Sequence, residues 1–441
     1  MNPNPVNPPP SDPPGLTLAV VGAGPVGLGL ALHAARSLPQ ASITLFDARD
    51  AAKDVSGDPR TLALSLGSVQ ILERLGAWRP ALAQPILEVH VSQQPPSGLS
   101  ELLPFLPERF DEPELRIRAI DEAVPLLGAV LSYGGIVAPL QEVWLAAERA
   151  EPQRLHSRFG TSVSALKSVE RGVEVDAGIA ERFDLVVIAE GGVFAERSAA
   201  ADAGKALATL PRAPLKHDYA QTAWVGQVTF ADDARRAPGV AFERFTRHGP
   251  AALLPLKDGR AALVWCVASA GDPVRELDDA QRVAVLNSIF PEAAGRIASI
   301  SPLKEFALGL IAERTLTDGR TVRIGNAAQT LHPVAGQGLN LGLRDAATIS
   351  ELVVEARRDG GDIGSADVLA RYDRLRRADV TSRALAVDAL NRSLLSDFLP
   401  VQGARGFGIY LLDRIAPLRR AVMREGVEPA AQPRLMRGEA L

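Results

Sequence analysis

The chain of 441 residues contains a single cysteine and only six histidines. One cysteine excludes an internal disulfide framework and any metal cluster built from several cysteines. The histidines show no spacing that suggests a metal site, so no metal is expected. Because Cys266 lies within the apolar run AALVWCVA, we expect a buried, inert thiol and a reducing compartment.

An excess of positive charge is also missing. The net charge is −4 and the isoelectric point about 6.0, which argues against a nucleic-acid partner. Hydrophobic residues make up 46% and charged residues 23% of the chain, as in a soluble globular protein with a sizeable core. The length allows about three domains, or two large ones.

Long hydrophobic runs are scarce. Residues 1–15 hold seven prolines and no apolar centre of a signal peptide, so we expect a disordered leader there. Leu16–Ala35 is almost wholly apolar, but its glycines and its strand pattern favour a strand followed by a helix over a membrane span. No other candidate span is present in the sequence.

The run Leu18–Gly27, LAVVGAGPVG, ends in the pattern G-x-G-x-x-G and leads into a helical pattern. A second apolar run ends at Asp47, 20 residues past Gly27. In dinucleotide-binding folds the first glycine allows a tight turn, the second lets the pyrophosphate approach, the third permits close helix packing, and the acid holds a ribose. The pattern predicts dinucleotide binding, FAD or NAD, by Gly22, Ala23, Gly24, Pro25, Val26, Gly27 and Asp47; the alternative is an ordinary glycine-rich turn.

A second glycine-rich segment, Arg323–Asp345, reads RIGNAAQTLHPVAGQGLNLGLRD. Its pattern predicts a strand, a tight loop and the start of a helix, whose free N–H groups favour an anion or a developing negative charge. Since it follows the first motif by about 300 residues, both segments would contact one large cofactor wrapped by the fold.

The remaining patterns divide the chain into three parts. Between the motifs we expect a helix within Gly57–Trp78, a helix at Pro139–Ala150, and strands at Pro85–Ser92, Val169–Asp176 and Phe183–Ala189. From about Ala220 short strands separated by turns predict an antiparallel sheet, with strands Thr222–Thr229, Val240–Phe245, Ala251–Pro255 and Ala261–Val267. After Asp345 the pattern is helical to near Arg424.

Two blocks, FERFTRHGPAALLP at Phe242–Pro255 and AAQTLHPVAGQGLNLG at 327–342, complete a family resemblance. The chain resembles the class A flavoprotein monooxygenases and, among them, the ring hydroxylases of ubiquinone biosynthesis, within these the 2-octaprenyl-6-methoxyphenol hydroxylases. The resemblance implies an α/β fold like that of p-hydroxybenzoate hydroxylase. A Rossmann-like FAD-binding domain would comprise 16–92, 120–200 and 310–360, an inserted antiparallel-sheet substrate domain 93–119 and 210–309, and a helical C-terminal region 361–441.

The resemblance also implies the chemistry. FAD would be bound non-covalently and reduced by NAD(P)H, and a flavin C4a-hydroperoxide would transfer one oxygen atom of O2 to a polyprenylated phenol. Two alternatives stay open: a flavin-dependent hydroxylase or reductase acting on another aromatic compound, and a weakly active flavoprotein that serves as a scaffold in a biosynthetic complex.

Site residues follow by position in the family's motifs. Arg60 would lie near the pyrophosphate, Gln141 would touch the cofactor, and Asn326 would bind the ribityl chain in place of the usual Asp. Glu190-Gly191 occupies the second fingerprint, with Glu for Asp and Phe194 where Ser is common, which leaves nicotinamide contacts open. The flavin edge would meet Pro333, Gly336, Gln337, Gly338, Leu339 and Asn340, with Pro333 and Gly336 next to the reaction and His332 either a general base or structural.

The substrate wall would come from the antiparallel sheet. Thr222, Trp224, Phe242 and Phe245 would line an apolar pocket, or else form plain core. The tail Val401–Leu441 carries seven arginines against four acids, with apolar residues between them. This composition predicts either peripheral contact with a membrane surface or partner enzyme, or a packed C-terminal helix. We therefore expect a cytoplasmic protein, peripheral to the inner membrane if the tail docks there; no motif predicts an oligomeric state.

Overall fold

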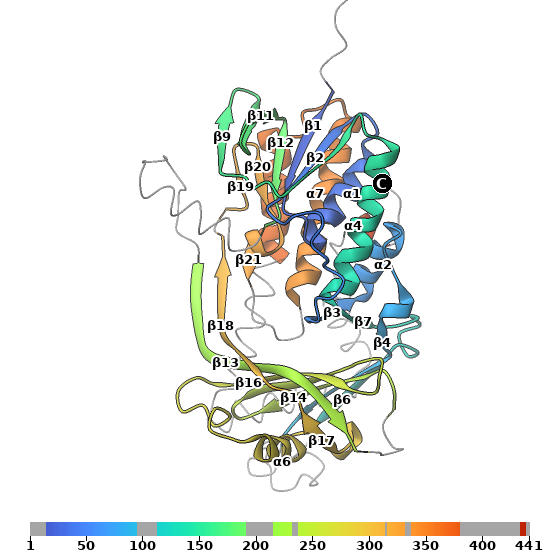
Figure 1. The fold of residues 1–441 in the computed structure, drawn as a ribbon, viewed down its shortest axis with the longest axis vertical. Coiled ribbons are helices and arrows are strands. Elements are labelled where there is room, and N and C mark those ends of the chain that lie inside the picture. The colour runs from blue at the N-terminus through green and yellow to red at the C-terminus, as the bar shows by residue number, and fades with distance from the viewer. Residues whose placement is uncertain are drawn as a thin grey trace, which may run out of the picture.

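The computed structural model describes residues 15–94, 113–190, 215–231, 237–313, 315–330, 337–379 and 433–437. They form a parallel sheet covered by helices and a larger, mainly antiparallel sheet, and the long strands β13 and β18 run between the two regions (Figure 1). The α/β class with a second, antiparallel sheet is confirmed.

The first region is built on a sheet with the strand order β19-β20-β12-β1-β2-β8. All neighbouring strands are parallel except β19 and β20. Its central strands are apolar along their length because helices and other strands cover both faces. The bounds are β1 Thr17–Val21, β2 Ser42–Asp47, β8 Leu155–Phe159, β12 Leu185–Ile188, β19 Thr317–Asp318 and β20 Thr321–Arg323. We call this sheet and its helices the parallel-sheet region.

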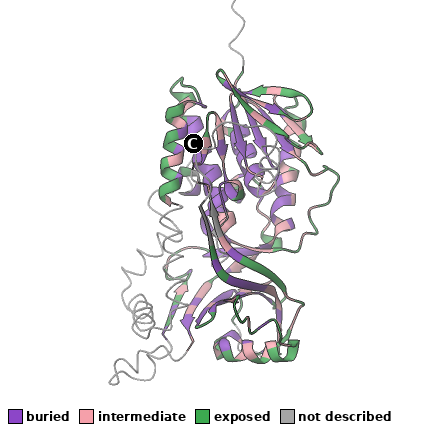
Figure 2. Cartoon of the chain, turned by 90° about the vertical axis from the view of Figure 1, so that its left-hand side faces the viewer, coloured by how far each residue is buried: buried purple, intermediate pink, exposed green. Residues whose placement is uncertain are grey.

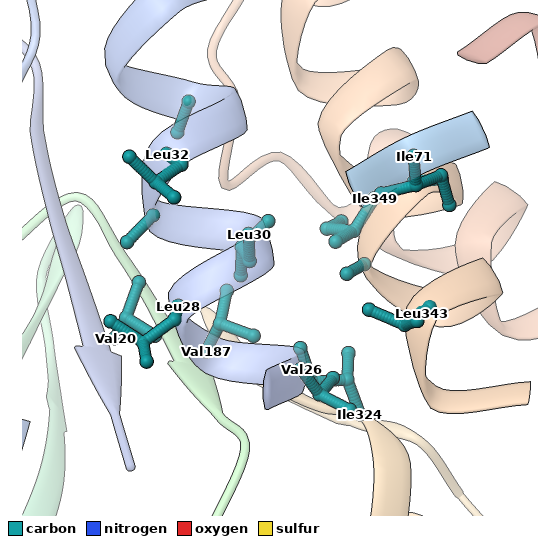
Figure 3. Packing of buried hydrophobic residues seen from close by; sticks show 14 of the residues in the cluster. Val20, Val26, Leu28, Leu30, Leu32, Ile71, Val187, Ile324, Leu343 and Ile349 are labelled. Atoms are coloured by element: carbon teal, nitrogen blue, oxygen red, sulfur yellow. The ribbon is translucent and has the colours of Figure 1, made fainter. Parts of the chain in front are cut away.

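Helix α1 (Pro25–Ser37) is apolar around most of its circumference because it is enclosed by the sheet, α4 (Tyr133–Ala150) and α7 (Gln337–Arg358). Figure 3 shows the packing of Leu30 and its neighbours against Leu343 and Ile349 of α7. Buried residues are concentrated in this region, whereas α6 of the other region exposes much of its surface (Figure 2). A further helical stretch spans 366–379.

The large sheet has the strand order β21-β18-β13-β16-β15-β14-β5-β6, and β17 pairs with β13. One face is covered by α6 (Asp279–Ile289) and the other looks toward the parallel-sheet region (Figure 1). The bounds are β5 Glu88–Gln93, β6 Glu114–Arg118, β13 Leu215–Phe230, β14 Val240–Thr246, β15 Gly249–Pro255, β16 Ala261–Ala268, β17 Ile297–Ile300, β18 Lys304–Ala312 and β21 Gln329–Thr330.

Two small sheets complete the described residues. One joins β3 (Thr61–Ser65), β7 (Gly128–Ser132) and β4 (Gln84–Ile86), and the other joins β9 (Ala165–Val169), β10 (Gly172–Asp176) and β11 (Ala180–Phe183). Short 3-10 turns lie at Pro80–Leu82, Glu292–Ala294, Gly325–Ala327 and Arg434–Arg437.

Several expected elements differ from the structure, among them the following three. Helix α2 begins only at Leu66, where the Ser65 hydroxyl accepts a hydrogen bond from Ser68 N, because the residues before it pair with β7 as strand β3. The expected strand Pro85–Ser92 is two strands in two sheets. Val169–Asp176 crosses a hairpin turn at Arg171, whose φ of 56° ends β9.

The strand pairing also moves a domain boundary. Strand β5 pairs with β14 and β6 in the large sheet, whereas a boundary after residue 92 assigns most of β5 to the FAD-binding domain. The apolar stretch Leu16–Ala35 divides into β1 and α1, as expected. Among the described residues no helix is both long and apolar enough to cross a membrane.

Candidate active site

The carboxyl ends of β1, β2 and β12 meet at one edge of the parallel sheet, where ligands of such sheets bind. They place Gly22, Asp47 and Glu190 side by side. Gly22 has a φ of +106°, and a Cβ atom there would lie 2.8 Å from Glu190 N. Only glycine satisfies both the turn and this close approach. The structure thus brings together the first and second predicted fingerprints.

The N-terminus of α1 opens at this edge without a side-chain cap. Its N-cap is Gly24, and the first intrahelical bond runs from Leu28 N to Gly24 O at 2.9 Å. Pro25 has no N–H, so Val26 and Gly27 supply the donors that a phosphate would use. A Cβ on Gly27 would lie 1.9 Å from Gly22 O, which explains the third glycine of the motif.

Asp47 braces the glycine turn from the neighbouring strand. Its Oδ2 accepts a hydrogen bond from Ala23 N at 2.5 Å, and its Oδ1 accepts one from Arg49 N at 2.7 Å. Arg49, which the sequence analysis missed, donates to Ala23 O at 3.2 Å from the other side. Asp47 therefore has a positioning role in this structure, and its contact with a ribose stays a prediction.

Arg60 reaches the same edge through an aromatic ring. Its guanidinium lies 4.1 Å from the centre of the Tyr133 ring and pairs with Asp58 at 2.8 Å, while its side chain remains 66% exposed. The Tyr133 hydroxyl is the nearest atom to a Cβ built on Gly24, at 3.6 Å. Arg60 is thus available to an anion beside the glycine turn. Tyr133 was missed, although its place after the N-cap Ser132 marks the start of α4.

Gln141 of α4 carries a buried side-chain oxygen, Oε1, with no hydrogen-bond partner in the described structure. Leaving such an acceptor unpaired costs about 1–3 kcal/mol, so a ligand that donates a hydrogen bond would relieve it. Together with the uncapped N-terminus of α1, this orphaned oxygen fits the FAD that the sequence predicts.

The second glycine-rich segment packs directly on the first. Gly325, at the end of β20, has a φ of +59°, and Cβ atoms on Gly325 and Gly342 would lie 3.4 Å and 2.7 Å from methyl groups of Val26. Figure 3 shows Val26 beside Ile324 and Leu343. The two glycine-rich segments are therefore in direct contact, and their contact with one cofactor stays a prediction. Asn326, in the turn after Gly325, is exposed.

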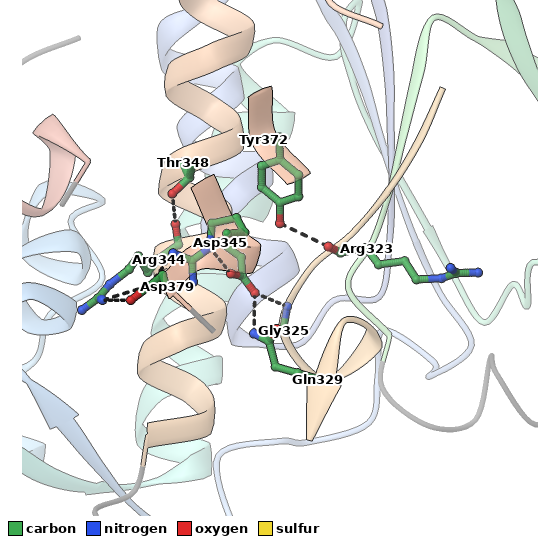
Figure 4. A network of polar contacts seen from close by, with 9 residues as sticks. Arg323, Gly325, Gln329, Arg344, Asp345, Thr348, Tyr372 and Asp379 are labelled. Carbon is green, nitrogen blue, oxygen red and sulfur yellow. Dashed lines mark hydrogen bonds and ion pairs between the residues drawn. The ribbon is translucent and has the colours of Figure 1, made fainter. Parts of the chain in front are cut away.

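A buried ionic network holds the Gly325 loop (Figure 4). The Asp345 carboxylate accepts hydrogen bonds from Gly325 N at 2.9 Å and Gln329 Nε2 at 3.1 Å, and pairs with Arg376 Nε at 2.5 Å. Arg376 also bonds Asp379 at 2.6 Å. Burial raises the pKa of Asp345, and the adjacent Arg376 guanidinium opposes that rise. None of these side chains was among the predicted site residues.

The start of α7 is tied to β3 by Asn340, whose side chain accepts a hydrogen bond from Ser65 N at 2.9 Å and donates one to Ala63 O at 3.0 Å. The Leu339 side chain packs on the core, and a Cβ on Gly338 would meet nothing within 4 Å. At Gly338, therefore, the backbone of α7 borders open space that a cofactor could occupy. The predicted site residues Gly191, His332, Pro333 and Gly336, and the Gln337 side chain, lie outside the described residues.

Three of the four expected pocket residues lie on the wrong face of the large sheet. Trp224 and Phe242 pack with α6, and Trp224 Nε1 donates to Asp272 Oδ2 at 3.0 Å. Thr222 has the same orientation in β13 and bonds Ser269 at 2.9 Å. They form core on the side away from the parallel-sheet region, which corrects the expectation for a substrate wall. Phe245 belongs to the opposite face.

Residues of β14 that alternate with Phe242 face the parallel-sheet region. Ala241 packs with Ile86 and Val130 of the small sheet β3-β7-β4, so Glu243 and Phe245 share its face. Glu243 is half-buried there, and desolvation raises the pKa of its carboxyl to about 7. Cys266 is buried, as expected, and its pKa is raised by burial.

Comparison with known proteins agrees with this geometry. A family model described as an FAD binding domain matches residues 197–386. The chain is 33% identical over 436 residues to the ubiquinone hydroxylase UbiL of Rhodospirillum rubrum, covering 96% of this chain and 92% of that protein. It is 28% identical to the 3-demethoxyubiquinol 3-hydroxylase of Escherichia coli, covering 92% and 97%.

The solved structures show the fold. Klebsiella pneumoniae HpxO, complexed with FAD and uric acid, aligns with a TM-score of 0.66 and 17% identity over 93% of this chain and 97% of that one. The p-nitrophenol 4-monooxygenase PnpA of Pseudomonas putida aligns with a TM-score of 0.65 and 15% identity over 94% and 98%. Given its identity to the Rhodospirillum protein over nearly all of both chains, the protein belongs to the family of FAD-dependent ubiquinone-biosynthesis hydroxylases.

Proposed function

We propose that the protein uses FAD, NAD(P)H and O2 to insert one oxygen atom into the aromatic ring of a polyprenylated phenol of ubiquinone biosynthesis. The observation that carries the proposal is the meeting of two glycine-rich segments on Val26, at the carboxyl edge of the parallel sheet. A second sheet, with an apolar face turned toward that edge, supplies a wall for an aromatic substrate.

The chain's residues divide the work between holding the cofactor and shaping its surroundings. FAD, when bound, accepts hydride from the nicotinamide and activates O2. The N–H groups at the start of α1 and the Arg60 guanidinium would bind the pyrophosphate. The backbone N–H groups at the start of α7 would stabilise negative charge on the reduced ring. Asp345 would keep the Gly325 loop in its conformation.

The test monitors both the oxidation state of the flavin and the incorporation of oxygen into the phenol. The purified protein, supplied with FAD, should show a bound-flavin spectrum that NAD(P)H bleaches without oxygen and air restores. A phenol should accelerate NAD(P)H oxidation and be recovered with one added hydroxyl group. Acceleration without oxygen-dependent product would favour a reductase. A flavin that stays oxidised in the presence of NAD(P)H and phenol would favour the scaffold.

We further propose that the arginine-rich stretch before residue 433 contacts an anionic membrane surface, where a polyprenylated substrate resides. Its charge and apolar residues support this; the whole stretch lies outside the described residues. The end of the tail packs on the protein instead, since Met436 is buried and the turn 434–437 contacts α2 and α7.

Truncation would disturb that packing, so charge reversal is the cleaner test. Arg419→Glu with Arg420→Glu should weaken binding to vesicles containing anionic lipid and leave FAD content unchanged. Equal vesicle binding by the variant and the parent protein would argue for the packed-helix alternative.

A further inference from the structure

Glu243 of β14 lies on the face of the large sheet that looks toward the parallel-sheet region. In the strand register Glu243 lies opposite Val91 of β5 and Ala252 of β15, and Ala252 lies opposite Val264 of β16. The carboxyl is therefore set in a row of apolar side chains. Phe245, two residues further along β14, shares the same face.

The acids nearest to Glu243 in the pairing of the sheet have partners and point the other way. Glu114 of β6 bonds His90 at 3.0 Å, and Glu88 of β5 pairs with Arg118 at 3.2 Å, both on the α6 side. In contrast, no hydrogen bond or ion pair joins the Glu243 carboxyl to the described residues, and the titratable group that interacts with it electrostatically is the buried Cys266 thiol of β16. An unpaired, half-buried carboxyl lowers stability, and sites of this kind are frequently functional.

The geometry points to a partner brought by the substrate. We propose, building on the function proposed above, that the Glu243 carboxylate accepts the hydrogen bond of the phenolic hydroxyl and takes up its proton as the ring is hydroxylated. The phenolic O–H bond breaks, an O–H bond forms on the carboxyl oxygen, and the electron pair stays on the phenolic oxygen. The proton returns to the oxygen of the product.

The proposed proton transfer would activate the aromatic ring of the substrate. A phenol with a pKa near 10, the value for Tyr, is neutral at pH 7, and removing its proton makes the ring more electron-rich. A base works best when its pKa lies close to the working pH, and burial shifts the Glu243 pKa in that direction. Apolar neighbours such as Val91 and Ala252 offer the carboxylate no competing hydrogen bond.

The test compares the full protein with its Glu243→Gln variant, using 2-methoxyphenol and its methyl ether as probes. Gln keeps the shape and removes a desolvated charge, so the variant should fold and bind FAD like the parent. We expect kcat/KM for the phenol to fall by about 100-fold or more, the lower range of general base catalysis. The rise of kcat/KM through about pH 7 in the parent should be absent from the variant. Glu305→Gln, which removes an exposed ion pair with Arg275 on the α6 side, is the matched control.

Binding gives a readout that needs no turnover. The parent should bind the phenol at least about tenfold more tightly than the ether, the effect of one hydrogen bond to a charged group, and the Gln variant should bind both alike. Equal discrimination and an unchanged pH profile in the variant would overturn the inference. A parent that discriminates phenol from ether but forms no hydroxylated product would refute the proposed function alone. Should Glu243→Gln fail to fold, Glu243→Asp must keep the pH dependence at a reduced rate.

Discussion

The two regions of the molecule differ in the hydrogen-bond partners that they provide to a carboxyl removed from bulk water. In the parallel-sheet region, Asp345 is fully buried and every contact it makes is to the protein: Gly325 N, Gln329 and Arg376. On the large sheet, Glu243 is half-buried among apolar side chains, and the structure describes no partner for it. The first carboxyl fixes a loop, whereas the second remains available to a ligand. Burial alone therefore does not identify a functional acid; the state of its hydrogen bonds does.

The regions also differ in what forms their surface. At the edge of the parallel sheet glycine backbone forms several of the contacts between segments, so these positions have little freedom to change. The face of the large sheet is made of alternating side chains, and its chemistry can change by single substitutions. The following predictions test this contrast.

The largest effect is expected at Gly27. An alanine Cβ there would lie 1.9 Å from Gly22 O, so Gly27→Ala must displace either α1 or the turn. We expect a loss of about 4 kcal/mol or more in the free energy of unfolding and no retained FAD. Flavin content after gel filtration and a denaturant titration would measure both. Gly57→Ala, whose Cβ meets nothing within 4 Å, is the control; equal behaviour of the two variants would contradict the account.

The second-largest effect is expected for the ionic network around Asp345. Asp345→Asn leaves the buried Arg376 guanidinium beside a neutral amide, which should lower the free energy of unfolding by about 3–5 kcal/mol. Glu355→Gln, which breaks the exposed pair with Arg371, should change it by less than about 1 kcal/mol. Urea unfolding of both variants tests this, and a similar small loss in both would show that the network does not hold the Gly325 loop.

His33 of α1 links the stability of the parallel-sheet region to pH. Burial lowers its pKa from 6.5 to about 4, and its Nδ1 has no hydrogen-bond partner in the described structure. The unfolded chain therefore binds a proton at a higher pH than the folded one. The contribution of His33 should be full above about pH 6.5 and should fall by about 3 kcal/mol as the pH drops to 4.

Comparison with a variant that lacks His33 separates its contribution to the pH dependence from that of the other titrating groups. His33→Leu removes the titrating group, so unfolding free energies measured from pH 7 to pH 4 should decline less steeply in the variant than in the parent protein. Parallel curves would mean that the buried imidazole does not carry the pH dependence.

The smallest effect is expected on the α6 side of the large sheet. Trp224→Phe removes the hydrogen bond to Asp272 and should lower the free energy of unfolding by about 1 kcal/mol. Because Trp224 faces away from the parallel-sheet region, KM for a phenol should stay unchanged. A several-fold rise in KM with unchanged stability would show instead that Trp224 lines the substrate pocket, as the sequence suggested.

The cofactor edge could be predicted from the sequence because its geometry demands particular residues. Gly22 and Gly27 are required by a turn and a close contact, and Asp47 ends the next strand at the expected distance. That both this motif and the Gly325 segment serve one large cofactor was expected from their patterns, and the structure adds that they touch each other at Val26.

Which face of the large sheet each side chain occupies could not be predicted from the sequence. The face to which a side chain points depends on register, and a shift by one residue exchanges the faces. Trp224 and Phe242 were chosen for their aromatic character, while Glu243 lay unnoticed next to Phe242. The network around Asp345 depends on Arg376, which comes from a separate helix, and no local pattern reports such a contact.

The central claim is that the protein transfers oxygen from O2 to a phenol, and isotopically labelled dioxygen tests it most directly. The holoenzyme would be supplied with NAD(P)H and 2-methoxyphenol under labelled O2, and the product analysed by mass spectrometry. The account predicts one labelled oxygen atom in each hydroxylated product molecule. A product whose added oxygen comes from water, or NAD(P)H oxidation that yields only peroxide with every phenol tested, would contradict it.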